Sequence, residues 1–571
     1  MTTVYVPLDT VAVALDANVV ADRLSQAGAA VIRNGSHGLA WLEPLIEVEH
    51  SGERVAYGPM TPTTVTGLIA DGVLERPLTD HPFRQGPIVN HDFLQSQHRL
   101  VFDRIGHDSP LQIPDLADVL KALAMPPDTL IQMIETSGLR GRGGAGFPAH
   151  IKWRTVRDTE APRKYLVCNA DEGDSGTFAD RMLLEGDPFR LIEGMVIAGH
   201  ATGSNHGVVY LRSEYPVPET LYKRALEIAR ECNLIGQNVL GSDFDFDLEL
   251  FVGAGAYICG EETSLLESLE GRRGQIRIKP PVPAISGLLS MPTVVHNVIS
   301  FAAVPAIVRL GGETYRDLGV APSSGTMSFQ LAGNVKRGGL IEVPFGITLR
   351  EIVEGYGQGT LSGRPFKTVQ IGGPLGAYLS QQDLDARLTY EAMAELGAGI
   401  GHGGLVVFDD TVDLAEQARY AFEFCELESC GKCTPCRIGL TLIRQKLDDI
   451  SEGRGKMEDL DKLQELCEEI SQTSLCGLGE TAPKAILTGL KYFRKEYERH
   501  IVDQICDAAR CTGLYRYVVK EEDCVACGAC IKPCPTGAIT GGTRKVAAHI
   551  DMDLCINCNA CYQACGFLAI E

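Results

Sequence analysis

Cysteine placement constrains this chain more than any other feature of its sequence. The chain has 571 residues and 19 cysteines, and none of the cysteines precedes Cys168. Most of them fall into C-x2-C or C-x3-C runs after residue 429. Disulfide-rich secreted proteins instead distribute their cysteines along short chains. The runs therefore indicate metal or iron–sulfur ligands in a reducing compartment.

The first run predicts a cage of four thiolates. Cys430, Cys433 and Cys436 have C-x2-C-x2-C spacing, and Cys476 follows later in the chain. Soft thiolates suit iron, and a [4Fe–4S] cluster needs four external ligands. We therefore expect one such cluster here, whereas the neighbouring Cys425 and Cys467 are expected to be core thiols.

Two further runs at the end of the chain have the spacing of bacterial ferredoxins, in which the fourth cysteine of each run ligates the other cluster. Gly566 stands where a proline usually follows the second run. Zinc is the rival metal for any C-x2-C pair, but this octet fits two cubane clusters better. The predicted ligand sets are Cys524, Cys527, Cys530 with Cys565, and Cys555, Cys558, Cys561 with Cys534.

Charge and hydropathy narrow the class of protein. The formal net charge is −22, from 52 basic and 74 acidic residues, which disfavours nucleic acid as a partner. No run of about 18 apolar residues predicts a membrane span. Residues 1–7 lack a basic region followed by an apolar one, so no signal peptide is expected and a cytoplasmic location is predicted.

The first hundred residues predict a small α/β unit. Alternating apolar residues indicate strands near 4–7, 29–33, 45–49 and 55–58, with helices over 11–26 and 62–71. Thr61 is the expected N-cap of the second helix. The unit resembles a thioredoxin-like ferredoxin domain, but it has no cysteine and cannot hold a [2Fe–2S] cluster. An unrelated α/β cap is the alternative interpretation.

A glycine-rich loop over 138–148 follows an expected helix over 128–137. It contains Gly141-x-Gly143-x-x-Gly146, but a Rossmann fingerprint must follow a strand, so a plain Rossmann site is rejected. Backbone without side chains still lets N–H groups approach a phosphate or a flat ring. Arg140, Arg142 and Lys152 supply positive charge nearby, which argues against the alternative of a flexible surface loop.

Acidic residues follow two expected strands. The strand over 165–169 ends in a turn with Asp171, Glu172 and Asp174, which can accept hydrogen bonds from ribose hydroxyls or a flavin N–H, or form a solvated turn. Apolar residues at 251–252 precede glycines, Tyr257 and the pair Glu261-Glu262, and a helix over 264–269. Residues 292–298 are expected to open a further helix whose N-terminus favours a phosphate. Cys259 and His296 are expected to be structural.

The remaining chain predicts an insert and a helical bundle. Strands are expected at 329–333, 339–343 and 369–373, with a helix over 348–356, and no catalytic constellation stands out there. Helices are expected over 414–425, 438–450, 459–473 and 483–497. The predicted fold class is multidomain α/β. Together with the family resemblance given next, the pattern implies a thioredoxin-like unit at 1–95, an FMN- and NAD(H)-binding domain at 100–320, a β-grasp insert at 325–410, a helical [4Fe–4S] bundle at 411–500 and a two-cluster ferredoxin-like domain at 515–571.

Several of these motifs, in this order, resemble the NADH-binding flavoprotein subunit of respiratory NADH:quinone oxidoreductase and of soluble NAD-linked hydrogenases and formate dehydrogenases. The resemblance covers roughly residues 100–500 and implies one FMN, one NAD(H) site and one [4Fe–4S] cluster. It implies that Glu172 and Glu262 shape the reaction site. The implied cofactor contacts are Gly141, Arg142, Gly143, Gly144, Phe147, Lys152, Asn169, Asp171, Glu172, Tyr257, Gly260, Glu261, Glu262, Lys279 and Asn297.

The chain departs from this family's pattern at three places. His296-Asn297 stands where two asparagines are usual, Gly173-Asp174 follows Glu172, and Thr155 replaces an aromatic residue. The first departure concerns one contact to the FMN phosphate or ribityl chain. The third concerns NAD(H) contacts, among which the resemblance places Phe147, Glu262 and Lys279.

The expected function is hydride exchange between NAD(H) and FMN, coupled to one-electron transfer through three [4Fe–4S] clusters. The cysteine-free front unit resembles the β subunit of NAD-dependent formate dehydrogenase, which implies a larger partner subunit with molybdenum or tungsten and iron–sulfur clusters. The ferredoxin tail alone favours the β subunit of an NAD-linked iron hydrogenase. An electron-bifurcating flavoprotein and a non-enzymatic ferredoxin-like adaptor are two further candidate functions.

Overall fold

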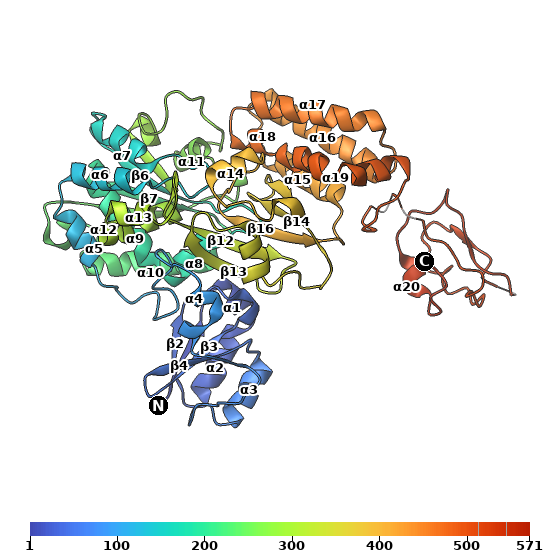
Figure 1. Ribbon diagram of the computed structural model, residues 1–571, viewed down its shortest axis with the longest axis horizontal. Coiled ribbons are helices and arrows are strands. Elements are labelled where there is room, and N and C mark those ends of the chain that lie inside the picture. The colour runs from blue at the N-terminus through green and yellow to red at the C-terminus, as the bar shows by residue number, and fades with distance from the viewer. Residues whose placement is uncertain (512, 515, 544) are drawn as a thin grey trace.

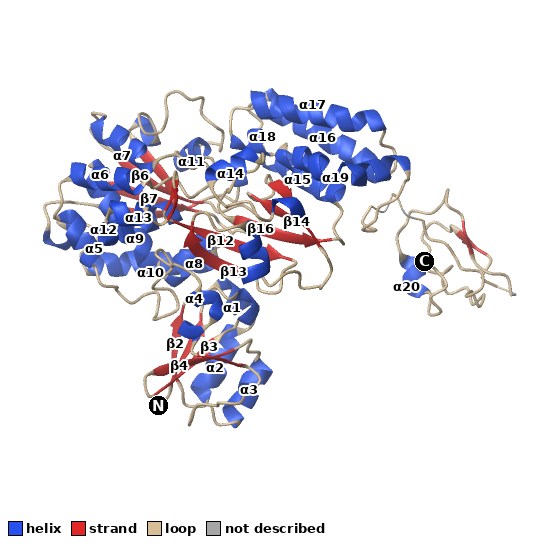
Figure 2. Ribbon diagram, viewed as in Figure 1, coloured by secondary structure: helices blue, strands red, loops and turns tan. Residues whose placement is uncertain are grey.

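The structure is a computed structural model that describes residues 1–571 except 512, 515 and 544. Figure 1 shows a small N-terminal unit attached to a larger mixed body, with a helical bundle at one end of that body. The C-terminal part stands apart beyond the bundle, as the secondary-structure colouring of Figure 2 also shows. Among the described residues, no helix combines the length and the apolar character needed to cross a membrane.

The N-terminal unit has one mixed sheet. Its strands and helices are β1 (Thr3–Pro7), α1 (Thr10–Ala14), α2 (Ala17–Gln26), β2 (Ala30–Asn34), β3 (Ile46–His50), β4 (Glu53–Tyr57), α3 (Pro62–Ala70) and β5 (Arg84–Gly86). The strand order is β2-β1-β3-β4-β5, with β1 parallel to β2 and the other pairs antiparallel. This is the expected thioredoxin-like layout. Thr61 caps α3 as predicted, but the expected single helix over 11–26 is divided at Asp16, which adopts a left-handed conformation.

The second domain is built on four parallel strands in the order β8-β7-β6-β9. The strands are β6 (Tyr165–Ala170), β7 (His206–Leu211), β8 (Asp247–Val252) and β9 (Thr293–Asn297). The helices are α5 (Ala117–Leu123), α6 (Pro127–Ser137), α7 (Ala149–Asp158), α8 (Ala179–Gly186), α9 (Pro188–Thr202), α10 (Pro216–Glu231), α11 (Glu262–Leu269), α12 (Val298–Leu310) and α13 (Gly312–Arg316). The chain runs from β6 outward to β8 and then returns to β9 on the other side of β6. The strand order therefore reverses between β6 and β9, where open parallel sheets bind their ligands.

One expected helix is wrong. Residues 293–297 form strand β9, which pairs in parallel register with β6, and helix α12 begins only at Val298. Thr293, Val294 and Val295 are β-branched and buried, which favours a pleated strand over a helical turn. Asn297 ends the strand and is the N-cap of α12. The predicted helix N-terminus is therefore present, but it lies at Val298.

The insert is a five-stranded sheet in the order β13-β12-β16-β14-β15. Its strands are β12 (Thr326–Gly333), β13 (Gly339–Pro344), β14 (Phe366–Ile371), β15 (Ala377–Ser380) and β16 (Gly404–Asp409). The central pair β12 and β16 is parallel and the outer pairs are antiparallel, as in the expected β-grasp insert. The expected helix over 348–356 is a π-helix, η6 (Glu351–Tyr356).

The bundle carries the first cysteine run at its helix ends. Its helices are α15 (Leu414–Glu428), α16 (Thr434–Ser451), α17 (Met457–Thr473), α18 (Gly477–Thr481) and α19 (Lys484–Val502). Helix α16 buries Leu440, Ile443 and Leu447 at helical spacing against its neighbours. Cys425 and Cys467 are fully buried core thiols, as predicted.

The C-terminal part has little regular structure. Its elements within the described residues are β17 (Ile539–Thr540), β18 (His549–Ile550) and α20 (Ala560–Ala564). A small buried cluster of Tyr517, Ile539, Ile550 and neighbouring cysteines forms its interior. An apolar core of this size gives little stability by itself, so bound clusters are expected to contribute folding free energy.

Candidate functional site

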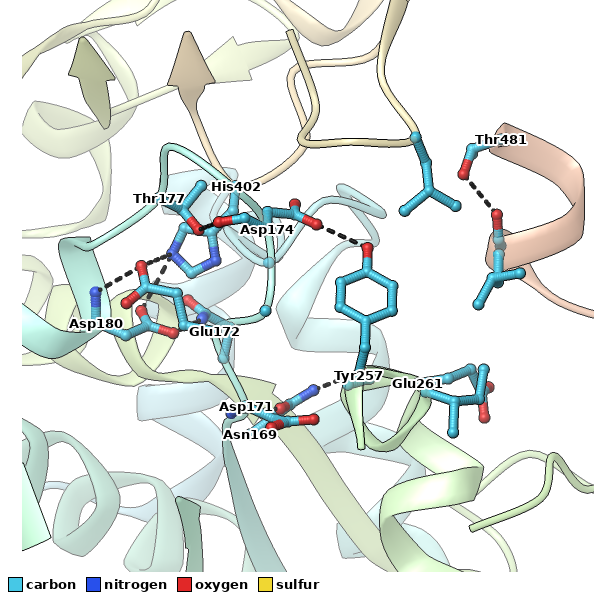
Figure 3. A pocket seen from close by; sticks show the side chains of 18 residues that line it. Asn169, Asp171, Glu172, Asp174, Thr177, Asp180, Tyr257, Glu261, His402 and Thr481 are labelled. Carbon is cyan, nitrogen blue, oxygen red and sulfur yellow. Dashed lines mark hydrogen bonds and ion pairs between the residues drawn. The ribbon is translucent and has the colours of Figure 1, made fainter. Parts of the chain in front are cut away.

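A polar pocket lies at the carboxyl ends of β6 and β9, where the strand order reverses. Asn169 lies next to the last residue of β6 and is half-buried, Asn297 ends β9, and the glycine-rich loop reaches the pocket at Gly143. Figure 3 shows the lining side chains converging from the sheet, the 257–261 turn and helix α18. The lining residues are Gly143, Asn169, Asp171, Glu172, Gly173, Asp174, Thr177, Asp180, Tyr257, Ile258, Gly260, Glu261, Asn297, Leu375, His402, Gly477, Leu478 and Thr481.

Asn169 and Asp171 present hydrogen-bonding groups at the base of the pocket. The Asn169 side chain donates to the Gly260 carbonyl at 2.7 Å and accepts from the Asp171 N–H at 3.1 Å. One carboxylate oxygen of Asp171, Oδ2, is buried and has no hydrogen-bond partner among the described residues. Burial raises the pKa of Asp171 to about 7. A buried acceptor without a partner favours a ligand that donates an N–H or O–H.

A buried ionic cluster forms one wall of the pocket (Figure 3). His402 Nε2 lies 3.1 Å from Asp180 and 3.7 Å from Glu172. Glu172 also accepts hydrogen bonds from the first N–H groups of helix α8 and from the Tyr215 hydroxyl. Burial opposes the imidazolium form of His402, but the carboxylates outweigh burial and raise its pKa to about 9. Asn297 donates to Asp180 at 2.7 Å and so ties β9 to this cluster.

Tyr257 crosses the pocket and contacts the acidic turn after β6. Its hydroxyl donates to Asp174 at 2.7 Å, and its ring lies so close to Gly173 that a Cβ there would sit 2.4 Å from a ring carbon. Gly173-Asp174, which departs from the family pattern, therefore has a structural reason in this chain. The acidic turn is not a solvated surface turn, because Glu172 is buried and Asp174 is bonded.

Beside Glu261, which lines the pocket, lies a group of paired charges that we call the rim. Lys152 contacts Glu262 at 3.0 Å, and Lys279 contacts Glu261 at 3.2 Å and Glu262 at 3.3 Å. Burial opposes ionisation of Glu262, but the two lysines hold the pKa of its carboxyl below its usual range. The Phe147 ring is 45% exposed and lies 5.9 Å from the Lys152 ammonium. An exposed aromatic face beside paired charges suits a planar heterocycle such as nicotinamide.

The glycine-rich loop is held by hydrogen bonds within the loop and by contacts of its arginines with the rest of the protein. The Gly141 N–H donates to the Phe147 carbonyl at 2.9 Å, and Arg140 pairs with Glu391 at 2.6 Å. Arg142 is buried, and its guanidinium donates to the Tyr315 hydroxyl and the Ser324 carbonyl. Both arginines thus direct their charge into the protein. Gly143 is the loop residue that faces the pocket, where a Cβ would lie 2.9 Å from Asn297 Cβ.

The four predicted cage cysteines come together at helix ends. Cys430 follows α15, Cys433 caps α16, Cys436 lies in its first turn, and Cys476 caps α18. Burial raises the pKa of Cys436 to about 11, the Ser429 hydroxyl opposes this, and the other three cage thiols add to it. Cys430, Cys436 and Cys476 belong to one buried cluster, and Cys433 packs against it, so the four cysteines lie near one another. The main chain of residues 275–276 lies against the cage, because Lys432 donates to the Ile276 carbonyl and Gln275 to the Cys430 carbonyl.

Pocket and cage adjoin. Gly477 and Leu478 line the pocket, and the residue directly before them is the cage ligand Cys476. On the other side, the Tyr257 N–H donates to Glu428, two residues before Cys430, and its ring packs edge-on against Phe424. A redox group in the pocket is therefore separated from a cluster in the cage by a few side chains.

The tail cysteines gather into the two exchanged sets that the spacing predicts. One cavity is lined by Cys524, Cys527, Cys530 and Cys565. A second cavity is lined by Cys534, Cys555, Cys558 and Cys561. Each set combines three cysteines of one run with the last cysteine of the other, which matches the donor set of two [4Fe–4S] clusters. Cluster binding by each set stays a prediction.

The structure brings together about half of the predicted cofactor contacts. Gly143, Asn169, Asp171, Glu172, Tyr257, Gly260, Glu261 and Asn297 line the pocket. Phe147, Lys152, Glu262 and Lys279 lie at its rim, whereas Gly141, Arg142 and Gly144 do not line it. His296 is a core residue that accepts a hydrogen bond from the Trp153 indole, as expected.

Sequence reasoning missed Asp180 and His402. Asp180 lies in a helix that follows the acidic turn, and His402 lies in the run Gly399–Gly404, far along the chain. The glycines on both sides of His402 were the one feature of the sequence that could have pointed to a site there. The pocket fits a flavin mononucleotide. Asp171 Oδ2 is a buried acceptor without a partner, and the backbone at Gly143 and Gly260 carries no side chain that would keep a ring away. Acidic residues also lie where the strand order of the sheet reverses, which is where such sheets bind ligands.

Family models match three parts of the chain. Residues 134–306 match the Nuo51 FMN-binding domain, residues 416–500 the NADH-ubiquinone oxidoreductase-F iron–sulfur binding region, and residues 516–566 a 4Fe-4S dicluster domain. The first match contains the pocket's sheet, the second contains the cage, and the third contains the two tail sets. FMN and iron–sulfur clusters are thereby supported as the cofactors.

Similar proteins are subunits of redox complexes. The NADP-reducing hydrogenase subunit HndC of Solidesulfovibrio fructosivorans is 47% identical over 74% of this chain and 86% of its own length. An NADH-quinone oxidoreductase subunit of Streptomyces coelicolor is 46% identical over 69% of this chain and 88% of its own. A crystal structure of an NAD⁺-reducing [NiFe]-hydrogenase in the H₂-reduced state matches with a TM-score of 0.65 and 30% identity, over 88% of this chain and 85% of that one.

These matches agree with the pocket, the cage and the order of domains. The chain belongs to the 51 kDa-like family of FMN- and iron–sulfur-binding flavoprotein subunits, and it is an NAD(H)-dependent oxidoreductase subunit of a multisubunit complex.

Proposed function

We propose that this chain exchanges a hydride between NAD(H) and FMN in the pocket and passes single electrons through the cage cluster to the tail. The contiguity of pocket and cage at Cys476, Gly477 and Leu478 carries this proposal. A bound flavin supplies the chemistry that links two-electron and one-electron carriers. The chain's own residues bind, orient and exclude water, and none of them needs to act as a covalent nucleophile.

The lining residues divide this work. Asp171 Oδ2 would accept a hydrogen bond from a bound flavin, and Gly143 and Gly260 would let a flat ring approach the backbone closely. The buried carboxylates of Glu172 and Asp180 with His402 set the electrostatic field along one wall. At the rim, Phe147 offers a face for stacking, while Glu262 is held ionised by Lys152 and Lys279 and would accept hydrogen bonds from the amide or ribose groups of a bound nicotinamide nucleotide.

An anaerobic titration of the flavin- and cluster-reconstituted chain with NADH tests this function. We expect bleaching of the flavin absorbance together with cluster reduction, and a comparison with NADPH tests the choice of nucleotide. Bleaching of the flavin without cluster reduction would contradict the electron path. Absence of flavin binding would contradict the pocket itself and would favour the ferredoxin-like adaptor.

For the partner we propose a larger, formate-oxidising subunit with molybdenum or tungsten and iron–sulfur clusters. The supporting feature is the thioredoxin-like unit at 1–95, which has no cysteine. The hydrogenase structure aligns with 88% of the chain. The remainder, 12% of 571 residues or about 69, is shorter than that unit, so part of the unit has a counterpart in a hydrogenase.

A hydrogen-oxidising partner is the second candidate, because similar proteins include hydrogenase subunits. Affinity purification of the native complex, followed by metal analysis and assays of NAD⁺ reduction with formate or hydrogen, separates the two. Molybdenum or tungsten with formate turnover supports the first candidate. Nickel or iron alone with hydrogen turnover supports the second. Thiolate ligands in such number favour a reducing compartment, which we propose is the cytoplasm.

A further inference from the structure

Four buried side chains meet where the bundle joins the C-terminal part of the chain. This tetrad consists of Asp413, His500, Cys506 and Cys511, and its candidate ligand atoms all lie within 4.8 Å of one another. Asp413 caps the first turn of α15, and His500 lies in the last turn of α19. Both cysteines belong to the segment that follows α19. None of the four belongs to the cage or to the tail sets.

The distances within the tetrad fit one tetrahedral ion. Cys506 Sγ lies 3.3 Å from Asp413 Oδ2, and Cys511 Sγ lies 3.5 Å from His500 Nε2 and 3.8 Å from Asp413 Oδ1. Zn–S bonds of about 2.3 Å and Zn–N or Zn–O bonds of about 2.0 Å give S···N and S···O separations of about 3.5 Å in a tetrahedron. The His500–Asp413 separation of 2.8 Å is shorter, so a bound ion would spread this pair by about half an ångström.

The surrounding hydrogen bonds leave the required atoms available. His500 Nδ1 donates to the Glu496 carbonyl of its own helix at 2.7 Å, which turns Nε2 toward the tetrad. Histidines that ligate metals are usually oriented by a bond of this kind at the other ring nitrogen. The Arg510 N–H donates to Cys506 Sγ at 3.3 Å, a contact that favours a thiolate. Asp413 uses Oδ1 to cap α15 through the Glu416 N–H, and Oδ2 faces His500 and Cys506.

Burial argues against other roles for this tetrad. The side chains of His500 and Asp413 are 0% exposed, and Cys511 is 3% exposed. A Cys-His-Asp arrangement for nucleophilic catalysis needs access for a substrate, which such burial denies. Two thiols, one imidazole and one carboxylate are all groups that bind zinc, and four protein ligands with no open position are the arrangement of a structural zinc site.

We propose that the tetrad is a structural zinc site. Zinc there joins the beginning of α15, the end of α19 and the 503–511 segment, which are separated in sequence but meet at this point. The ion thereby fixes the root of the segment that leads to the ferredoxin-like tail. If the proposed function is correct, this fixes where the tail begins relative to the cage that α15 delivers.

Metal analysis and X-ray absorption of the full chain test the proposal. We expect about one zinc per chain in addition to iron, with two sulfur ligands near 2.3 Å and two nitrogen or oxygen ligands near 2.0 Å. Absence of zinc above background would overturn the proposal, as would a disulfide between Cys506 and Cys511 in the mass of the intact chain. Both readouts use the unmodified protein and require no variant to fold.

Variants then locate the ion. In Cys506→Ser with Cys511→Ser, zinc is expected to fall at least about tenfold, while FMN content stays unchanged. The matched control is Cys232→Ser, a half-buried thiol outside every cysteine set, which is expected to retain zinc. Zinc retained in the double variant would place the ion elsewhere and overturn the assignment. Because zinc content is measured without NADH, failure of the proposed redox function leaves this test intact.

Discussion

At the scale of single residues, Gly143 is where the backbone of the glycine-rich loop approaches the pocket most closely. A Cβ at this position would meet Asn297, which also caps α12 and ties β9 to Asp180. We expect Gly143→Ala to displace Asn297 and lower FMN affinity at least about tenfold, with a loss of about 1–3 kcal/mol in unfolding free energy from overpacking. Flavin fluorescence titration and chemical denaturation measure the two effects.

The control for this substitution is Gly67→Ala. Gly67 lies within helix α3, and a Cβ there would contact nothing within 4 Å. Alanine favours the helix by roughly 1 kcal/mol, so this variant is expected to bind FMN normally and to be slightly more stable. Equal FMN affinity in both variants would show that the loop does not approach the flavin at Gly143.

His402 gives a prediction of pH dependence. Its pKa in the folded protein is about 9, raised from 6.5 by Asp180 and Glu172 against the effect of burial. Because the folded protein holds the His402 proton more tightly than the unfolded chain does, protonation of His402 stabilises the fold by about 3 kcal/mol. This contribution is fully present below pH 6.5 and is lost as the pH rises through 9. His402→Gln should therefore be clearly less stable than the unaltered chain at pH 6.5 and should differ little above pH 9. Denaturation curves of both proteins across this range measure the difference, and a constant difference would refute the assignment.

At the scale of elements, the cage depends on where helices end. Cys433 and Cys476 are N-caps, and Cys436 lies in a first turn, so three of the ligands sit at helix N-termini that favour negative charge. The bundle therefore positions thiolates at the pocket through the packing of α15, α16 and α18. Helix packing, and not loop conformation, is expected to keep the cluster next to the flavin.

Replacement of one cage cysteine tests the role of the cage in electron transfer. Cys476→Ser is expected to remove the cage cluster and lower iron from about 12 to about 8 per chain, if three cubanes are present. NADH-dependent reduction of ferricyanide at the flavin should persist, whereas reduction of the tail clusters should stop. The matched control is Cys467→Ser, a fully buried thiol in the same bundle. Normal tail reduction in Cys476→Ser would mean that electrons bypass the cage.

At the scale of the whole molecule, the C-terminal part stands apart from the body that holds the pocket (Figure 1). It also exposes large apolar side chains, among them Ile556 at 62% and Leu568 at 76%. Exposed apolar residues on a small electron-transfer domain favour contact with a partner chain. The tail is therefore the expected exit for electrons, while hydride exchange belongs to the body.

Deletion of residues 516–571 separates these roles. The shortened chain should keep NADH-dependent ferricyanide reduction within about twofold, because pocket and cage lie outside the deleted part. Electron transfer to the purified partner complex should be abolished. Zinc should remain, since the tetrad ends at Cys511. Undiminished transfer to the partner would show that the tail clusters lie on a side branch.

The sequence alone determined the features that depend on local spacing. The twelve cysteines predicted to bind clusters, the exchanged grouping in the tail, and the acids after β6 are encoded within short stretches, because ligand spacing and strand ends are local properties. The presence of the four long bundle helices followed from helical periodicity, since α17 and α19 have buried and exposed faces. Their ends were less exact, because α16 begins at Thr434, before the expected residue 438, and α19 continues to Val502, beyond the expected residue 497. The turn at Asp16 and the strand at 293–297 were not predictable in this way, since the strand is decided by pairing with β6.

Tertiary structure decided the features that join distant parts of the chain. His402 meets Asp180 across more than two hundred residues, and Asp413 meets Cys511 across 98 residues, so no spacing rule connects either pair. In the sequence, the charges of Arg140 and Arg142 suit a phosphate, but the fold turns them toward Glu391 and Tyr315. Side-chain direction depends on packing between elements, whereas ligand type and spacing depend on the chain itself. This is why iron–sulfur clusters could be predicted from cysteine spacing and FMN from the family resemblance, whereas the walls of the pocket could not be predicted.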